Sequence, residues 1–131
     1  MKTPTLLLRI GGLINLLIGI LHVGFWCLFD WSEELLRLSW ENSNIMQMLN
    51  LFTIVFFFYT GFVLMFIPGK LLTNAAGRSF IGLFATLYLA RLGMEFYFPH
   101  ASIGFATFLA ISMLFFVYPL VQTKNLRHAN Q

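Results

Sequence analysis

The sequence predicts an all-α membrane protein in which four transmembrane helices form an antiparallel up-down bundle. Apolar residues make up 59% of the 131 positions, charged residues make up only 10%, and the mean hydropathy is +0.80. A soluble domain carries roughly 25% charged residues. The apolar residues also form long runs, each close to the ~20 residues with which a helix crosses a ~30 Å hydrocarbon core. These runs cover about Leu6–Phe29, Ile45–Ile67, Ser79–Phe98 and Ser102–Val121.

The continuity of these runs favours helices over barrel strands. Backbone groups in lipid must be hydrogen-bonded within the protein, so only helices and closed barrels span a membrane. The runs lack the in–out alternation of barrel strands. Short connections favour antiparallel neighbours and leave no room for a second unit. We therefore expect a single domain over residues 1–131.

The first span carries its small and polar residues on one helical face. Gly12, Asn15, Gly19 and His22 recur at steps of three and four. Small residues let helices approach closely, and amide or imidazole groups can hydrogen-bond across the contact. This face is predicted to be buried. The apolar run is longer than the 7–15 residues typical of a cleaved signal peptide, so we expect an uncleaved signal anchor that stays in the fold.

The connection after the first span predicts a short amphipathic helix on the membrane interface, over about residues 31–41. Asp30 followed by Glu33 has the pattern of an N-cap with its reciprocal acid. Trp31, Leu35 and Leu38 recur at helical spacing, and tryptophans are typical interface anchors. The segment is interpreted as a connector or, alternatively, as a lid over a site in the outer leaflet.

The remaining spans differ in polarity. The second carries Asn50 and ends at the Pro68-Gly69 breaker. The third carries Tyr88, Arg91 and Glu95, and the last two are one turn apart and can neutralise each other. The fourth has only mildly polar residues.

The basic residues predict the orientation. Six of the eight lysines and arginines fall on one side of a four-span arrangement: Lys2, Arg9, Lys70, Arg78, Lys124 and Arg127. The opposite side holds only Arg37, and the eighth, Arg91, lies within a span. The positive-inside bias therefore predicts a multi-pass inner-membrane protein with both termini in the cytoplasm. Because these residues lie at span ends, the net charge of +3 does not indicate a nucleic-acid partner.

Four strongly polar side chains are predicted to share one depth. His22, Asn50, Arg91 and Glu95 come from three spans, and counting ~1.5 Å per residue places each within roughly 10 Å of the outer edge. Charged groups inside a membrane are costly, so their presence needs a reason. With Tyr88 and Asn15 they form the predicted ligand-binding set.

Two interpretations of this set stay open. In the first, it is a structural knot of hydrogen bonds and ion pairs. In the second, it is an outward-facing polar pocket for a lipid headgroup, a quinone or a small amphiphile. Arg91 would then bind an anionic group, and His22 or Glu95 could transfer a proton.

No cofactor or metal is predicted. His22, Glu95 and His100 are the available metal ligands, but they are scattered and include no short-spaced pair. Haem would need an axial histidine within the bundle, and only His22 is deep enough. No Ser-His-Asp group, C-x-x-C pair or phosphate loop occurs, so no catalytic residues are assigned and enzymatic activity is left open.

Several short segments resemble a group of small bacterial four-helix inner-membrane proteins. They are His22, Phe29-Asp30-Trp31, Glu34-Leu35, Leu38, Asn42, Ile45, Arg91-Leu92 and Glu95-Phe96, and the resemblance covers about residues 10–100. No activity is assigned to that group. The resemblance implies the four-span architecture and directs attention to His22, Arg91 and Glu95, but it transfers no reaction.

Three functions follow as hypotheses. The first is a non-enzymatic accessory protein or a binder of lipids or small amphiphiles. The second is a small membrane enzyme that acts on a lipid-soluble substrate through His22, Arg91 and Glu95. The third is an oligomeric transporter. The expected partners are membrane lipid and either another protein or further copies of this chain.

Overall fold

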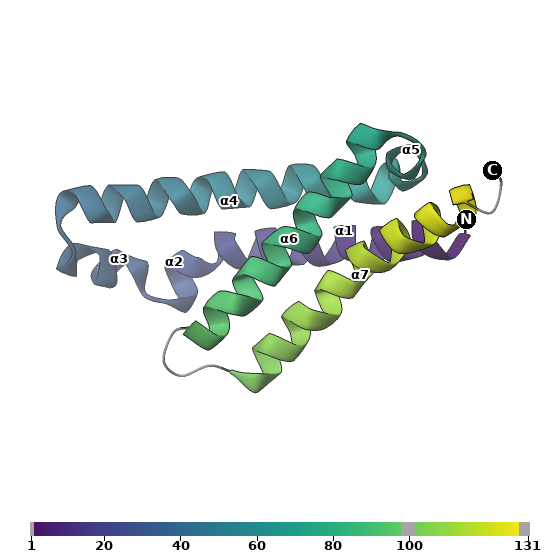
Figure 1. Ribbon diagram of the computed structural model, residues 1–131. Coiled ribbons are helices and arrows are strands. Elements are labelled where there is room, and N and C mark those ends of the chain that lie inside the picture. Colours follow the sequence, from purple (N-terminus) through teal and green to yellow (C-terminus); the bar gives the residue numbers. More distant parts are fainter. Residues whose placement is uncertain (1, 98–101, 129–131) are drawn as a thin grey trace. The chain divides into compact units, whose positions relative to one another are not determined.

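The computed structural model describes residues 2–97 and 102–128, with backbone alone for residues 124–128, and this part of the chain is all-α. Its helices are shown in Figure 1: α1 (Lys2–Val23), α2 (Phe25–Leu28), α3 (Trp31–Glu34), the 3-10 turn η1 (Leu35–Arg37), α4 (Trp40–Phe66), α5 (Pro68–Thr73), α6 (Ala75–Tyr97) and α7 (Ile103–His128). Among the described residues, four helices are long and apolar enough to span a membrane, namely α1, α4, α6 and Ile103–Thr123 of α7. The predicted all-α class with four membrane-spanning helices is confirmed, and the packing of these four helices into one bundle stays a prediction.

The first predicted span, 6–29, is interrupted in the structure. α1 ends at Val23, and Gly24 separates it from α2. The Gly24 amide donates to the Ile20 carbonyl at 3.1 Å, whereas the amides of Cys27 and Leu28 both donate to the Gly24 carbonyl. Glycine is among the poorest helix formers, and the hydrogen-bond ladder restarts at this residue. The prediction of one continuous helix up to Phe29 is therefore wrong, because α1 already ends at Val23.

The predicted amphipathic helix over 31–41 is also broken. It divides into α3 and η1, and Leu38 is extended (φ −92°, ψ 161°) before α4 begins. Trp31 and Leu35 are buried, whereas Leu38 and Trp40 are exposed. Only the first half of the segment therefore packs against the protein.

The helix start at Asp30 differs from the expected cap. Asp30 does precede α3, but it adopts a left-handed conformation (φ 46°) and its carboxylate makes no capping bond. Its backbone carbonyl accepts the amides of Glu33 at 2.8 Å and Glu34 at 3.0 Å, as that of an N-cap residue does. The prediction of a side-chain cap was wrong: such a cap typically has its backbone in the β region, whereas Asp30 is left-handed.

The chain packs as two compact parts. We call residues 12–63 the N-terminal hairpin and residues 64–131, together with residues 1–11, the C-terminal hairpin. The single-domain organisation expected from the sequence stays a prediction.

In the N-terminal hairpin, α1 and α4 run antiparallel and approach closely at glycines (Figure 1). A Cβ atom built on Gly61 would lie 2.7 Å from the Leu16 side chain and 2.9 Å from the Gly12 carbonyl oxygen. One built on Gly19 would lie 3.3 Å from the Phe58 ring. Gly12, Asn15 and Gly19 are buried. The predicted buried face of the first span is confirmed at these three residues, whereas its fourth member, His22, is half-buried.

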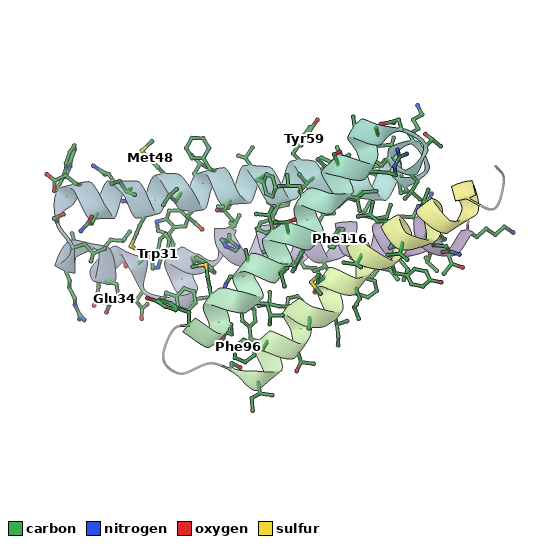
Figure 2. All side chains as sticks on the ribbon, in the orientation of Figure 1. Trp31, Glu34, Met48, Tyr59, Phe96 and Phe116 are labelled. Atoms are coloured by element: carbon green, nitrogen blue, oxygen red, sulfur yellow. The ribbon has the colours of Figure 1, made fainter. Side chains whose placement is uncertain are left out.

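In the C-terminal hairpin, α6 and α7 lie side by side in opposite directions (Figure 1). Their core is aromatic. The fully buried Phe116 ring (Figure 2) stacks on Phe84 at 5.2 Å and on Tyr88 at 5.5 Å between ring centroids. A Cβ atom on Gly11 would lie only 2.8 Å from the Phe116 ring, so α1 begins against the same core.

The α5–α6 corner is fixed by a side-chain cap. The Asn74 carboxamide oxygen accepts the Gly77 amide at 2.7 Å, which is the bond expected of an N-cap asparagine. Its amide nitrogen donates to the Lys70 carbonyl at 2.9 Å. Gly77 packs directly on the Leu71 backbone, where a Cβ atom would clash. The short α5 helix is thereby held against the start of α6.

Candidate functional site

The six residues of the predicted ligand set divide between the two hairpins. Asn15, His22 and Asn50 belong to the N-terminal hairpin. Tyr88, Arg91 and Glu95 belong to the C-terminal hairpin. The structure brings residues together within each group, as described below. A meeting of the two groups at one depth stays a prediction.

Glu95 joins the end of α6 to the beginning of α7. One carboxylate oxygen, Oε2, lies 3.0 Å from Nη1 of Arg91. The other, Oε1, accepts the backbone N–H of Ser102 at 2.9 Å. Both oxygens are therefore engaged, and the Glu95 side chain is only 12% exposed. The ion pair inferred from the one-turn spacing of Arg91 and Glu95 is confirmed.

Ser102 and Phe105 complete this arrangement. The Ser102 hydroxyl accepts the Phe105 amide at 3.3 Å, and its carbonyl accepts the Ala106 amide at 2.8 Å, so Ser102 is the N-cap residue of α7. The guanidinium carbon of Arg91 lies 5.0 Å from the centroid of the Phe105 ring, within cation–π range. Sequence reasoning did not include these two residues in the site. Serine before an apolar run is a helix-start pattern that could have indicated Ser102.

The Arg91 guanidinium contacts Glu95 and Phe105, and the rest of it is exposed. Glu95 and Phe105 hold it, yet 46% of the side chain remains exposed. Leu87 and Met94, one turn to either side on α6, are exposed as well. A guanidinium has five N–H donors in a planar fork that suits carboxylate and phosphate. The donors not used by Glu95 can therefore bind an anionic group at an otherwise apolar surface.

Tyr88 lies in the core of the C-terminal hairpin. It is 5% exposed and stacks on Phe116. Arg91, three residues later, is half-exposed, so the two side chains have different environments. Tyr88 therefore supports the helix that carries Arg91 through packing.

His22 and Asn50 form a pair at the end of α1. The Asn50 amide nitrogen donates to the His22 backbone carbonyl at 3.1 Å. This carbonyl belongs to the last turn of α1, where no following helical amide completes the ladder. Asn50 is 5% exposed, and its Oδ1 has no hydrogen-bond partner within residues 2–97 and 102–123. Asn50 thus caps a helix end inside an apolar environment.

The His22 ring is fixed by its own helix and by aromatic neighbours. Nδ1 lies 2.8 Å from the Ile18 carbonyl oxygen, which can only accept, so Nδ1 carries a proton and donates to it. The ring centroid lies 4.4 Å from that of Phe25 and 5.8 Å from that of Phe57. His22 is half-buried. These contacts with Ile18, Phe25 and Phe57 orient the ring.

Asn15 links α1 to α4 deeper in the same hairpin. Its amide nitrogen donates to the Thr60 hydroxyl at 3.4 Å, and that hydroxyl donates to the Phe56 carbonyl at 2.6 Å. Asn15 and Thr60 are buried at 0% and 2% exposure. Such polar bonds hold helices together in lipid, so Asn15 has a structural role here.

The described residues offer no cluster of side chains suited to a metal ion. Among the described residues, no group of three His, Cys, Asp or Glu side chains could hold a metal ion. His100, one of the three ligands considered from the sequence, lies outside the described residues.

No protein-family model, curated protein or solved structure matches this chain.

Proposed function

We propose that this chain is a small integral membrane protein that binds the anionic headgroup of a lipid-like amphiphile at Arg91, as a non-enzymatic binding or accessory protein. The observation that supports this most is the half-exposed guanidinium of Arg91 on an apolar helix face. Four helices long and apolar enough to span a membrane provide the setting.

The depth of Arg91 suits a headgroup. Arg91 lies six residues before the end of α6 at Tyr97, which corresponds to about 9 Å along the helix. An arginine at that depth can extend its side chain toward the interface. The neighbouring exposed residues, Leu87 and Met94, suit contact with acyl chains. The combination favours a ligand with a charged head and an apolar tail.

Glu95 and Phe105 favour binding by pre-orienting the guanidinium. The ion pair at 3.0 Å and the ring at 5.0 Å limit the rotamers of Arg91 before a ligand arrives. A preorganised side chain loses less entropy on binding. The pair is neutral overall, so selectivity would come from directional hydrogen bonds to phosphate or carboxylate oxygens and less from net charge.

The test is the lipid that remains bound after gentle purification. Protein extracted in a mild detergent would be treated with organic solvent and the extract quantified by mass spectrometry, for the wild type, Arg91→Gln and Arg37→Gln. Arg37 also pairs with a glutamate, Glu34 at 3.0 Å, but it lies in η1 with a 71% exposed side chain, which makes it a matched control. We expect a stoichiometric amphiphile in the wild type and Arg37→Gln, and a several-fold loss in Arg91→Gln.

Two results would contradict the proposal. One is an unchanged amount of co-purifying amphiphile in a folded Arg91→Gln protein. The other is loss of helical structure in Arg91→Gln, which would support a purely structural ion pair. Arg91→Lys keeps the charge but loses the planar fork, so a folded Arg91→Lys protein with partial loss of ligand would support binding.

A further inference from the structure

A second cationic feature lies on the first turns of α1, in the C-terminal hairpin. Lys2, Thr5, Leu6 and Arg9 line an open hollow of about 380 Å³. These residues are spaced by three, one and three positions, so they share one face of the helix. Lys2 and Arg9 are both exposed, and the exposed Leu6 lies between them. The hollow thus has two charged ends and an apolar centre.

Within the described part of this hairpin, no acidic side chain pairs with either of these two cations. The chain has five acidic residues: Asp30, Glu33, Glu34, Glu41 and Glu95. Only Glu95 belongs to the C-terminal hairpin, and its carboxylate is paired with Arg91. The ion pairs found among the described residues are Arg37–Glu34 and Arg91–Glu95, so neither Lys2 nor Arg9 takes part in one. Among the described residues neither cation is paired with an acid, so both can bind an anionic ligand.

The position of the hollow limits what that anionic ligand can be. Lys2 begins a helix that is long and apolar enough to span a membrane. The end of such a helix lies at the level of the lipid headgroups. Basic pockets at that level bind anionic headgroups. Arginine binds phosphate through its fork and lysine binds it as a point charge. Leu6, 57% exposed, offers an apolar contact that free phosphate would not use.

We propose that Lys2 and Arg9 bind the phosphodiester headgroup of an anionic phospholipid in this hollow, with Leu6 against its glycerol and acyl region. This site is separate from Arg91 and does not depend on the function proposed for it. It takes a lipid with net negative charge, because two cations with no acid between them face the ligand. Zwitterionic lipid would gain less from the same contacts.

The test titrates defined lipids into delipidated protein and counts bound molecules by native mass spectrometry. The probes are a phosphatidylglycerol, a phosphatidylcholine with the same acyl chains, and inorganic phosphate. The variants are Lys2→Gln/Arg9→Gln, the charge-conserving Lys2→Arg/Arg9→Lys, and Arg37→Gln as an exposed arginine elsewhere. Each is also made in the Arg91→Gln background, so that a lipid bound at Arg91 does not contribute.

The wild type, Lys2→Arg/Arg9→Lys and Arg37→Gln should bind phosphatidylglycerol in preference to phosphatidylcholine. In Lys2→Gln/Arg9→Gln the affinity for phosphatidylglycerol should fall roughly ten- to thirty-fold, since each cation near a headgroup contributes to binding. Arg91→Gln should leave this preference intact. Equal binding of both lipids by the wild type, unchanged affinity in Lys2→Gln/Arg9→Gln, or equally tight binding of inorganic phosphate would each overturn the proposal.

Discussion

The side-chain amide of Asn50 on α4 donates a hydrogen bond of 3.1 Å to the backbone carbonyl of His22 at the end of α1. The two residues are 28 positions apart in sequence. A carbonyl at a helix end has no helical amide to accept from, and in lipid no water replaces it. The bond therefore allows α1 to end inside the protein and the chain to turn at Gly24.

Asn50→Leu should destabilise the fold by about 1 kcal/mol. The His22 carbonyl loses its donor, and part of this cost is offset because the unpaired Oδ1 of Asn50 is removed as well. Thermal unfolding in detergent would measure the change. Thr53→Val is the control, because the Thr53 hydroxyl bonds only within its own helix, to the Leu49 carbonyl at 2.8 Å. Equal stabilities of the two variants would argue against a capping role for Asn50.

Gly61→Ala should lower the free energy of unfolding by about 1–3 kcal/mol, because the added methyl group overpacks the contact between α1 and α4. The new methyl group would meet Leu16 at 2.7 Å and the Gly12 carbonyl oxygen at 2.9 Å, so α1 and α4 would have to move apart. Gly93→Ala is the matched control, since no atom of the described residues lies within 4 Å of a Cβ there. Unfolding midpoints of both variants check this. A Gly61→Ala protein as stable as Gly93→Ala would show that the close approach is not needed.

Phe116→Ala should lower the free energy of unfolding by about 3 kcal/mol, which would make it one of the most destabilising single substitutions in the C-terminal hairpin. The ring is fully buried and stacks on both Phe84 and Tyr88. Phe52→Ala should have little effect, because Phe52 is 66% exposed on α4. Stability in detergent and sensitivity to protease would compare the two. The aromatic core would be unnecessary if both variants behaved alike.

Two substitutions of Glu95 should distinguish the contribution of its ion pair with Arg91 to stability from that of its hydrogen bond with Ser102. Glu95→Gln keeps an oxygen that can accept the Ser102 amide but loses the charge that pairs with Arg91. Glu95→Ala loses both. We expect the melting temperature to fall in the order wild type, Glu95→Gln, Glu95→Ala, with a total loss of several degrees. Glu34→Ala, which breaks the exposed Arg37 pair, should change it hardly at all. A Glu34→Ala protein as unstable as Glu95→Ala would contradict this role.

The predicted orientation can be tested by cysteine labelling, because the chain contains a single cysteine, Cys27. In a Cys27→Ser background, Ser32→Cys places a thiol on α3 and Gly69→Cys places one on α5. Both termini in the cytoplasm would put residue 32 outside and residue 69 inside. A membrane-impermeant maleimide added to intact spheroplasts should label Ser32→Cys and spare Gly69→Cys. Lysed cells should give labelling of both, and the reverse pattern in intact spheroplasts would invert the topology.

Long-range hydropathy and one-turn spacing predicted much of this structure. The four long apolar runs correspond to α1, α4, α6 and α7 because burial in lipid requires continuous apolar helices. The buried face of α1 followed from small and polar residues at steps of three and four. The Arg91–Glu95 pair followed from helix geometry alone.

Other features depend on interactions that spacing does not encode. The bond from Glu95 to the Ser102 amide requires the particular path of the connection between α6 and α7. The bond from Asn50 to the His22 carbonyl requires the register between two helices far apart in sequence. The break at Gly24 depends on a single residue, and hydropathy averaged over a whole span does not reveal it. These contacts assign roles to Glu95 and Asn50 that their residue types alone left open.

The pairing of Arg91 with Glu95 also has an electrical consequence. A single charge within a span experiences the transmembrane voltage, and its energy changes whenever that voltage changes. Two opposite charges 3.0 Å apart feel almost equal and opposite forces. This stretch of α6 can therefore carry a guanidinium without being pulled along the field as the cell energises or depolarises its membrane.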